Sequence, residues 1–553
     1  MRNSWKLILI LVCILISGTT LRMYRLGSSP EGLLVDEVSF GYNAYSILKT
    51  GKDEHGKSFP VIFEAFGDQK LPGLVYSTVP FIQLFGLSAV AVRMPSAIAG
   101  SILILVSYFL ARAIHVRKAT AVVLSAVVAW SPWTIILSRF GYESNLALLI
   151  WSTSLIFLIQ SITKKKITSL IVFVSLLIFS WYFYIAYRVV GMLFLLAFGL
   201  FLLLQKRYRE LAVMGIVGCI LMAPILPTLF SSQGTARFTQ IGILHDRGIG
   251  AQSLESQNYC FFHFSSRFCR ILWNEPFIIG KALVERAVTF ISPSYLFLEG
   301  DRYLPYLHDG RYGLFSLVLL PFFYYGIMHP PKQKKIVFLI YGGLLISILP
   351  MILAGDPQKV RATPSFPFLL LLMGIGIEQA STIFRKYSTH MYAILIGGIF
   401  VYGIHFFISY LTIHLDKYDF AVNTHVTKLF KYLRDTHPQD EIQIVHAFSD
   451  PVMYYAYFFQ IDPTRYQTTV VWNDQESSGF KHARALQRFS VGQDAFMKKA
   501  CVVYVTDQPQ DSSEFLEHTI TSTNGVDTLF RIYQVVPPEG CPNPQHEYSQ
   551  TSN

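Results

Sequence analysis

An adjacent pair of carboxylates, Asp36 and Glu37, follows the first apolar segment of the chain and has the residue types for acid–base chemistry. Apolar and aromatic residues follow the pair at helical spacing, which predicts a short helix lying in the membrane interface. Carboxylates at that depth are partly desolvated, and desolvation raises the pKa of a carboxyl group and makes it a better general base. In the structural alternative, Asp36 caps the helix N-terminus and Glu37 is solvated there.

Further charged residues stand where later apolar segments begin. Lys70 precedes Leu71-Pro72, Glu143 opens an apolar segment, and Arg361 precedes another. An ammonium and a guanidinium at the interface suit a lipid-linked phosphate, whose chain stays in the bilayer. In the alternative interpretation, the basic side chains extend towards lipid headgroups and Glu143 caps the helix that it opens.

A long stretch between apolar segments, residues 231–311, ends in a mixture of aromatic and charged residues. Asp301, Arg302 and His308 lie there among tyrosines. Aromatic rings can stack on sugars, and the charged groups can pair with phosphate, which makes these three residues candidates for substrate binding. An aromatic belt around a structural loop would have the same composition.

The composition indicates a membrane protein. The chain has 553 residues, of which 52% are hydrophobic and only 15% charged, and a soluble protein of this length would carry more charge. We expect a polytopic α-helical protein with about eleven transmembrane helices. Lys and Arg gather in short clusters on one side of these helices, which places the N-terminus in the cytoplasm and argues against nucleic acid as a partner.

The pattern changes after the last apolar segment. We predict a transmembrane domain over residues 1–414, with outer loops at 22–70 and 231–311. Strand-like runs begin at Glu441, Cys501 and Thr528, and residues 421–436 have helical spacing, which predicts a small extracytoplasmic α/β domain over 415–536. The tail, 537–553, is rich in Pro, Gln and Ser and is expected to be disordered. Whether 71–87 crosses the membrane is left open.

Four cysteines lie outside the apolar segments. Cys260 and Cys269 share the long loop, and Cys501 and Cys541 share the C-terminal part. If both regions face an oxidising compartment, two disulfides can form, although the sequence does not determine their connectivity.

The order of these features resembles the membrane glycosyltransferases of the GT-C fold, and is most similar to the dolichyl-phosphate-mannose protein mannosyltransferase and aminoarabinose lipid A transferase (ArnT-like) group. The resemblance extends over residues 7–376. It rests on Glu31-Gly-Leu-Leu-Val-Asp36-Glu37, Gly67-Asp-Gln-Lys70-Leu-Pro72, Phe85-Gly-Leu-Ser-Ala-Val-Ala-Val-Arg93-Met-Pro95-Ser, Ser292-Pro-Ser with Gly300-Asp301, and Gly355-Asp-Pro-Gln-Lys-Val-Arg361.

The resemblance implies roles for individual residues. Asp36 stands where the family has its base or acceptor-orienting acid, Lys70 where a lysine contacts the carrier phosphate, and Glu143 where the next outer turn has an acid. The match of Arg361 is less direct. The chain departs from the family at Lys70-Leu-Pro, where many relatives have Lys-Pro-Pro, and at Lys359, where a His is frequent.

We therefore predict an inverting glycosyltransferase of the plasma membrane. It moves a sugar from a polyprenyl-phosphate donor to a hydroxyl of a protein, lipid or cell-envelope glycan on the extracytoplasmic face. Asp36 accepts the hydroxyl proton, Lys70 and Arg361 stabilise the departing phosphate, and Glu37 and Glu143 orient the acceptor or the sugar.

Two other functions stay open at this stage. Intramembrane charges and broken helices would also serve a transporter or flippase of lipid-linked sugars, and a non-catalytic envelope assembly protein would use the C-terminal domain as its working part. No cofactor is required by the motifs, although Asp36, Glu37 and Glu143 have the oxygen ligands that a divalent metal prefers. The sugar, the acceptor and the oligomeric state do not follow from the sequence.

Overall fold

The computed structural model describes residues 4–229, 243, 247–304, 310–354, 358–445, 448–476, 480–492, 501–509, 515–522, 525 and 527–534. The chain forms two compact units. The helical unit comprises Met1–Tyr24 and Ser96–Ser409, and the sheet unit comprises Arg25–Pro95 and Tyr410–Asn553. Residues 25–95 thus belong with the C-terminal part of the chain, a grouping that the sequence analysis did not predict. The predicted boundary after residue 414 stays a prediction.

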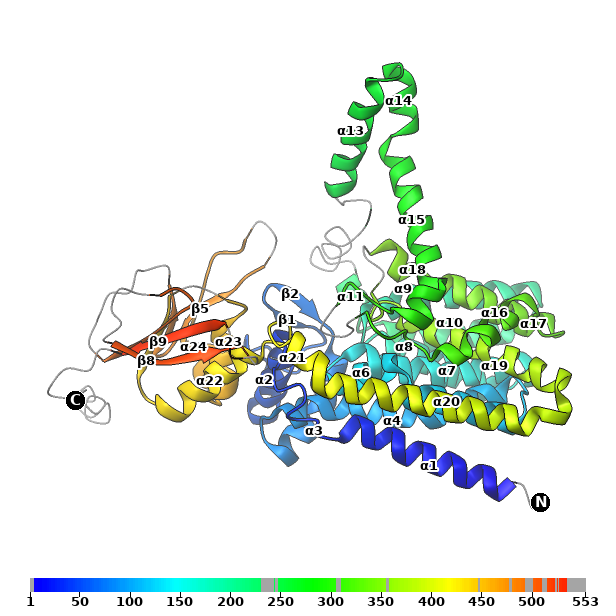
Figure 1. Ribbon diagram of the computed structural model, residues 1–553, viewed down its shortest axis with the longest axis horizontal. Coiled ribbons are helices and arrows are strands. Elements are labelled where there is room, and N and C mark those ends of the chain that lie inside the picture. The colour runs from blue at the N-terminus through cyan, green and yellow to red at the C-terminus, as the bar shows by residue number, and fades with distance from the viewer. Residues whose placement is uncertain are drawn as a thin grey trace. The chain divides into compact units, whose positions relative to one another are not determined.

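Long apolar helices make up most of the helical unit, and α1, α7 and α20 run in the same general direction in Figure 1. The helices with most of their length in this unit are α1 (Ser4–Met23), α4 (Ala89–Ala113), α5 (Lys118–Trp130), α6 (Pro132–Arg139), α7 (Glu143–Lys164), α8 (Ile167–Ser180), α9 (Ile185–Leu204), α10 (Tyr208–Met222), α11 (Leu226–Leu229), α13 (Arg247–Phe261), α14 (Ser266–Leu272), α15 (Glu275–Ile291), α16 (Leu320–Met328), α17 (Lys334–Val337), α18 (Gly343–Leu353), α19 (Phe366–Ile383) and α20 (Ser388–Ser409).

Seven of the described helices are long and apolar enough to cross a membrane, and an eighth is added if α5 and α6, bent by 48° at their junction, form one span. The chain is therefore a polytopic membrane protein, as predicted, although length and composition support fewer spans than the predicted eleven. Helix α3 (Pro72–Phe85) has 14 residues. At about 1.5 Å per residue it is shorter than the hydrocarbon core, so the segment 71–87 does not cross as a helix of its own.

The break between α5 and α6 is stabilised by a buried arginine. Pro132 begins α6 and has no backbone N–H, so the last carbonyls of α5 lack their usual helical partners. The fully buried Arg22 of α1 donates to the carbonyls of Val128 and Ala129, at 2.8 and 3.0 Å, and to the hydroxyl of Thr134 at 3.2 Å. Backbone groups at membrane depth must find hydrogen-bond partners within the protein, and Arg22 supplies donors for these two carbonyls.

Replacing Arg22 should therefore weaken the helical unit. Arg22→Met removes the donor to the carbonyl of Ala129, which costs about 1–3 kcal/mol, and leaves the carbonyl of Val128 with the hydroxyl of Thr134 alone, so we expect a clear fall in the unfolding temperature of the purified protein in lipid. Arg209→Met removes an exposed cation and should change that temperature little. Equal unfolding temperatures for the two variants would contradict this role of Arg22.

The sheet unit contains a mixed seven-stranded sheet of order β4-β5-β6-β3-β7-β9-β8. The strands are β3 (Glu441–Ile444), β4 (Val470–Trp472), β5 (Ala483–Leu486), β6 (Phe489–Val491), β7 (Val502–Thr506), β8 (Leu516–Thr521) and β9 (Thr528–Gln534). Strand β3 is parallel to both of its neighbours, and the other pairs are antiparallel. The accompanying helices are α21 (Leu415–Lys417), α22 (Thr424–Thr436), α23 (Pro451–Phe458) and α24 (Pro463–Thr469).

The predicted α/β character of the C-terminal part is confirmed. Helix α22 and strands β3, β7 and β9 were predicted, and the three strands are neighbours in the sheet. Strands β4, β5, β6 and β8 were not predicted. A disulfide joins Cys260 to Cys269, a pairing that the sequence left open. Cys501 is also oxidised, whereas Cys541 and the predicted disordered tail lie outside the described residues.

Candidate active site

A buried guanidinium holds the start of α2 (Val35–Thr50). Arg93 is fully buried, and its Nε and Nη2 donate to the two carboxylate oxygens of Glu37 at 2.8 and 3.1 Å. Its Nη1 donates to the carbonyls of Leu26 and Pro30, and Nη2 donates also to the carbonyl of Gly32. A guanidinium has five N–H donors, and here each has an acceptor. Arg93 therefore fixes both the segment before α2 and the first turn of the helix.

Glu37 is a positioning residue in this arrangement. Its carboxylate is buried, and Oε2 also accepts a hydrogen bond of 3.1 Å from the backbone N–H of Leu34 at the N-terminus of α2. Our structural alternative therefore had the two acids reversed: Glu37 caps the helix and is not solvated. The catalytic role predicted for Glu37 stays a prediction, but both of its oxygens already have structural partners.

Asp36, unlike the buried Glu37, forms an ion pair with Lys70. The Asp36 side chain is 47% exposed, and its Oδ1 lies 2.8 Å from Lys70 Nζ. The same ammonium lies 3.3 Å from Asp68 Oδ2, and the Lys70 side chain is only 10% exposed. The structure thus brings together the predicted base and the predicted phosphate ligand, with the ammonium held between two carboxylates.

A tight hairpin places Lys70. Strands β1 (Phe63–Ala65) and β2 (Asp68–Lys70) pair in antiparallel register, and the two residues between them, Phe66 and Gly67, have φ of 57° and 77°. Positive φ at both central positions is the geometry of a type I′ turn, which suits a two-residue hairpin loop. Helix α3 begins at Pro72, just after Lys70. The N-terminal end of a helix favours an anion, so its dipole adds to the charge of Lys70.

The apolar side chains of α2 are covered by protein, which corrects the prediction that they face the membrane interface. Val38 and Tyr42 are fully buried, and α2 packs against α3 and α23. The hydroxyl of Tyr42 donates to the carbonyl of Ile461 at 3.0 Å, and that of Tyr454 donates to the carbonyl of Leu33 at 2.6 Å. The periodicity of α2 was identified correctly, but its partner is the C-terminal part of the chain.

The C-terminal part also adds titratable groups near Asp36 that the sequence did not indicate. His482 Nδ1 lies 2.6 Å from Asp450 Oδ1. Burial raises the pKa of Asp450, the hydrogen bond to His482 opposes this, and the charge of Asp36 raises the pKa further. The backbone N–H of Lys481 donates to the carbonyl of Phe66 at 3.0 Å, which ties this region to the β1–β2 hairpin. No motif signalled these residues, because their proximity comes from the fold alone.

A second buried acid lies in the loop after α2. Glu54 is 1% exposed, and its Oε2 has no hydrogen-bond partner among the described residues. Burial raises the pKa of Glu54 to about 8, a hydrogen bond from Asn43 opposes this, and the charges of Asp53 and Asp450 contribute to the rise. Glu54 is therefore largely protonated at neutral pH.

The helical unit holds the other predicted residues. Asp301 is fully buried, and its carboxylate accepts from the backbone N–H of Lys359 at 2.8 Å and of Tyr303 at 2.9 Å. Burial raises the pKa of Asp301, and the charge of Lys359 opposes the rise. The more exposed Arg302 pairs with Glu299 at 2.7 Å. Asp301 therefore joins two loops of the unit.

Three further candidates remain predictions. Arg361 donates to the carbonyl of Ala354, Glu143 lies in the first turn of α7, and His308 lies outside the described residues. Arg361 and Glu143 belong to the helical unit, whereas Asp36 and Lys70 belong to the sheet unit. Among the described residues, no three His, Cys, Asp or Glu side chains are grouped as metal ligands would be; the divalent metal stays an open suggestion.

Solved structures share this architecture over nearly its whole length. ArnT from Cupriavidus metallidurans in the apo state superposes with a TM-score of 0.56 at 12% sequence identity, covering 98% of this chain and 100% of that one. The chain has the GT-C fold. ArnT bound to undecaprenyl phosphate gives a TM-score of 0.54 at the same identity and coverage. No family model matches the sequence, and a search of curated proteins finds no match. The fold predicted from the motifs is thus confirmed.

The Glu37–Arg93 pair predicts opposite behaviour for the two adjacent acids. Glu37→Gln leaves a buried guanidinium without its counter-charge, and breaking a buried pair costs about 3–5 kcal/mol. We expect a large fall in unfolding temperature for this variant. Asp36→Asn alters a half-exposed side chain and should unfold close to wild type. A thermal unfolding series of both variants in lipid tests this, and a fully stable Glu37→Gln would contradict it.

Glu54 predicts a pH-dependent stability. Its folded-state pKa, about 8, is higher than the ordinary value of 4.5, so its contribution is fully present below about pH 4.5 and is lost as the pH rises to 8. At about 1.4 kcal/mol per pKa unit, the loss is on the order of 5 kcal/mol. Glu54→Gln should remove this loss, and the variant should be more stable than wild type at pH 8. Unfolding temperatures from pH 5 to pH 8 measure it, with the half-exposed Glu31→Gln as control; parallel curves for wild type and Glu54→Gln would refute it.

Proposed function

We propose that the protein is a glycosyltransferase that uses a polyprenyl-phosphate sugar as donor and a hydroxyl group as acceptor. The observation that carries the proposal is the Asp36–Lys70 ion pair, which joins a half-exposed carboxylate to a largely buried ammonium at the N-terminal end of α3. The shared fold with ArnT, one structure of which is bound to undecaprenyl phosphate, supports this choice of donor.

In the proposed reaction, the donor phosphate displaces carboxylate from Lys70. The donor phosphate is a diester with one negative charge, equal to that of a carboxylate, and its two non-bridging oxygens accept hydrogen bonds, so it can take the place of one carboxylate at the ammonium. The neighbouring helix N-terminus favours the same anion. As Lys70 turns to phosphate, Asp36 loses its partner and becomes available as a base. Binding of the donor and activation of the acceptor would thus be coupled.

The chemical step then follows with one base and one leaving group. The acceptor oxygen attacks the anomeric carbon, its proton passes to Asp36, and the bond between that carbon and the phosphate oxygen breaks. Direct displacement inverts the anomeric configuration. Lys70 stabilises the negative charge that develops on the departing polyprenyl phosphate. The Asp450–His482 pair lies close enough for its charge to act on Asp36 and would help to orient the acceptor.

The remaining parts of the proposal rest on the sequence. Arg361 would add a second positive charge for phosphate, Glu143 and Glu37 would orient the sugar or the acceptor, and Asp301, Arg302 and His308 would belong to the substrate region. The reaction would take place on the extracytoplasmic face of the plasma membrane, with a cytoplasmic N-terminus. The acceptor would be a protein, a lipid or an envelope glycan.

The activity is tested with purified protein in lipid and a panel of radiolabelled polyprenyl-phosphate sugars. A positioned base contributes about a hundredfold or more, so Asp36→Asn should lose at least that in sugar release or transfer while staying folded. Lys70→Ala should be similarly impaired. The nearby Lys57–Glu64 ion pair provides matched controls, Glu64→Gln and Lys57→Ala, which should retain activity.

Two results would overturn the proposal. Turnover by Asp36→Asn at the wild-type rate would exclude Asp36 as the base. Movement of labelled lipid across the bilayer with no consumption of donor would identify a transporter of lipid-linked sugars instead.

A further inference from the structure

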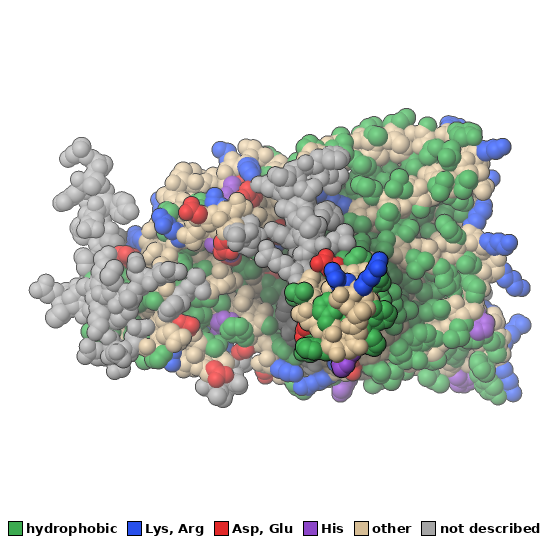
Figure 2. All heavy atoms as spheres, turned by 90° about the horizontal axis from the view of Figure 1, so that it is seen from above, with side chains coloured by type: hydrophobic (Ala, Val, Ile, Leu, Met, Phe, Trp, Pro, Cys, Tyr) green, Lys and Arg blue, Asp and Glu red, His purple; other side chains and the backbone are tan. Residues whose placement is uncertain are grey.

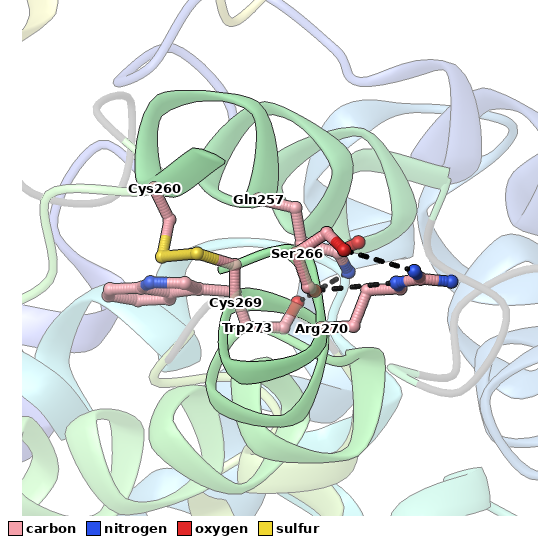
Figure 3. Close-up of a disulfide and its surroundings, with 6 residues drawn as sticks. All are labelled: Gln257, Cys260, Ser266, Cys269, Arg270 and Trp273. Atoms are coloured by element: carbon pink, nitrogen blue, oxygen red, sulfur yellow. Dashed lines mark hydrogen bonds between the residues drawn. A yellow bond between two sulfur atoms is a disulfide. The ribbon is translucent and has the colours of Figure 1, made fainter. Parts of the chain in front are cut away.

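Helices α13, α14 and α15 form a compact hairpin with its own interior. The Cys260–Cys269 disulfide joins α13 to α14, and Gln257 Nε2 donates to the carbonyl of Trp273 at 3.0 Å (Figure 3). Its small core consists of Ile243, Ile249 and Ile278, against which Trp273, Ile279 and Leu283 pack. The disulfide, the hydrogen bond and the small core therefore hold the three helices together, which fixes the side chains that face outward.

These outward-facing side chains are unusually apolar. The apolar tip of the hairpin consists of Leu254, Tyr259, Phe262, Phe264, Phe268 and Ile271, which are 49–81% exposed. Helix α15 continues it with exposed Phe277, Val284 and Val288, which share one helical face. Figure 2, which looks down on the hairpin, shows hydrophobic side chains around it. Soluble surfaces rarely expose so many large apolar groups together, so the tip has a partner.

The attachment of the hairpin indicates its depth. Arg286 of α15 donates to the carbonyl of Ile352 at 3.0 Å, and α18 ends one residue later, at Leu353. Residues Lys334–Leu353 form one of the candidate spans. The hairpin therefore leaves the bundle at the end of a span, where hydrocarbon gives way to headgroups. From there it runs across the direction of α20 (Figure 1), as an element lying along a membrane surface would.

The charges on the hairpin fit an anionic surface. Over residues 247–291 five basic residues (Arg247, Arg267, Arg270, Lys281 and Arg286) outnumber three acidic ones (Glu255, Glu275 and Glu285). Arg267 and Arg270 are both exposed and lie in α14, beside the apolar tip. Exposed His263 stands between Phe262 and Phe264. Aromatic rings combined with arginine are typical of segments that insert into the interface and pair with lipid phosphates.

We propose that the α13–α15 hairpin is a membrane-surface anchor, which inserts its apolar tip among the headgroups and upper acyl chains and pairs Arg267 and Arg270 with anionic lipid. It extends the protein sideways along the bilayer from the end of its spans. A second copy of the chain or another protein seated on the tip would be a different arrangement, which the experiment distinguishes.

Photo-cross-linking of the full chain tests this contact. Benzoylphenylalanine replaces Phe262 or Val284 in protein reconstituted in nanodiscs of phosphatidylcholine and phosphatidylglycerol. Leu196, 66% exposed on the candidate span α9, is the lipid reference, and Phe480, 44% exposed in the sheet unit, is the aqueous reference. We expect phospholipid adducts at 262 and 284 close in yield to those at 196 and well above those at 480. Adduct yields at the level of 480, or chain-to-chain adducts in place of lipid, would overturn the proposal.

The lipid composition of the adducts tests whether Arg267 and Arg270 bind anionic lipid. At position 262, adducts should be enriched in phosphatidylglycerol relative to its share of the nanodisc. Arg267→Gln combined with Arg270→Gln should remove this enrichment, whereas Arg385→Gln, which changes an exposed cation outside the hairpin, should not. Unchanged enrichment in the double variant would exclude the two arginines as the anionic-lipid ligands.

Discussion

The buried pair of Glu37 and Arg93 is the constraint on which the candidate site depends. Placing two charges in the interior is costly unless each is fully paired, and here every donor of the guanidinium has an acceptor. The pair joins three parts of the chain: the segment before α2 that contains Leu26, Pro30 and Gly32, the first turn of α2, and the start of α4, which bears Arg93. Because Glu37 is committed in this way, the preceding residue, Asp36, is held at a defined position with its carboxylate still half-exposed. Of the two adjacent acids, Glu37 is thus buried in a structural ion pair, whereas the carboxylate of Asp36 stays half-exposed.

The second feature of the site is that its basic residue is already neutralised. Lys70 lies between Asp36 and Asp68, so the resting site presents little free positive charge. Two carboxylates outnumber the single ammonium, so an anion can bind Lys70 only by taking the place of Asp36 or Asp68. Glu54, kept protonated by burial, adds no further repulsion to an anionic ligand at neutral pH. In the proposed function, binding of the donor phosphate and release of Asp36 are therefore one event.

Sequence reasoning succeeded where the information was local. The motif around Asp36 and the lysine before Leu71-Pro72 identified two side chains that do meet, and the apolar runs of β3, β7 and β9 identified strands at the buried part of the sheet. Of the missed strands, β4, β5 and β6 have only three or four residues, and β8 has six but is exposed over its first half, so no clear alternating pattern marks them. Arg93 lay within a recognised motif, yet its five acceptors come mainly from backbone carbonyls, which no sequence pattern encodes. The sequence did not indicate Asp450 and His482 for a related reason, since only folding brings them near Asp36.

The hydrogen bond from Tyr454 to the carbonyl of Leu33 joins residues 421 positions apart. Together with the packing of α23 on α2, it means that the helix bearing Asp36 gains its cover only from the last part of the polypeptide. During synthesis, the ribosome must add nearly the entire chain before this helix can be enclosed. The surroundings of Asp36 are therefore assembled late, after the intervening transmembrane helices have been made. A chain terminated early would retain apolar membrane helices but would lack an enclosed α2.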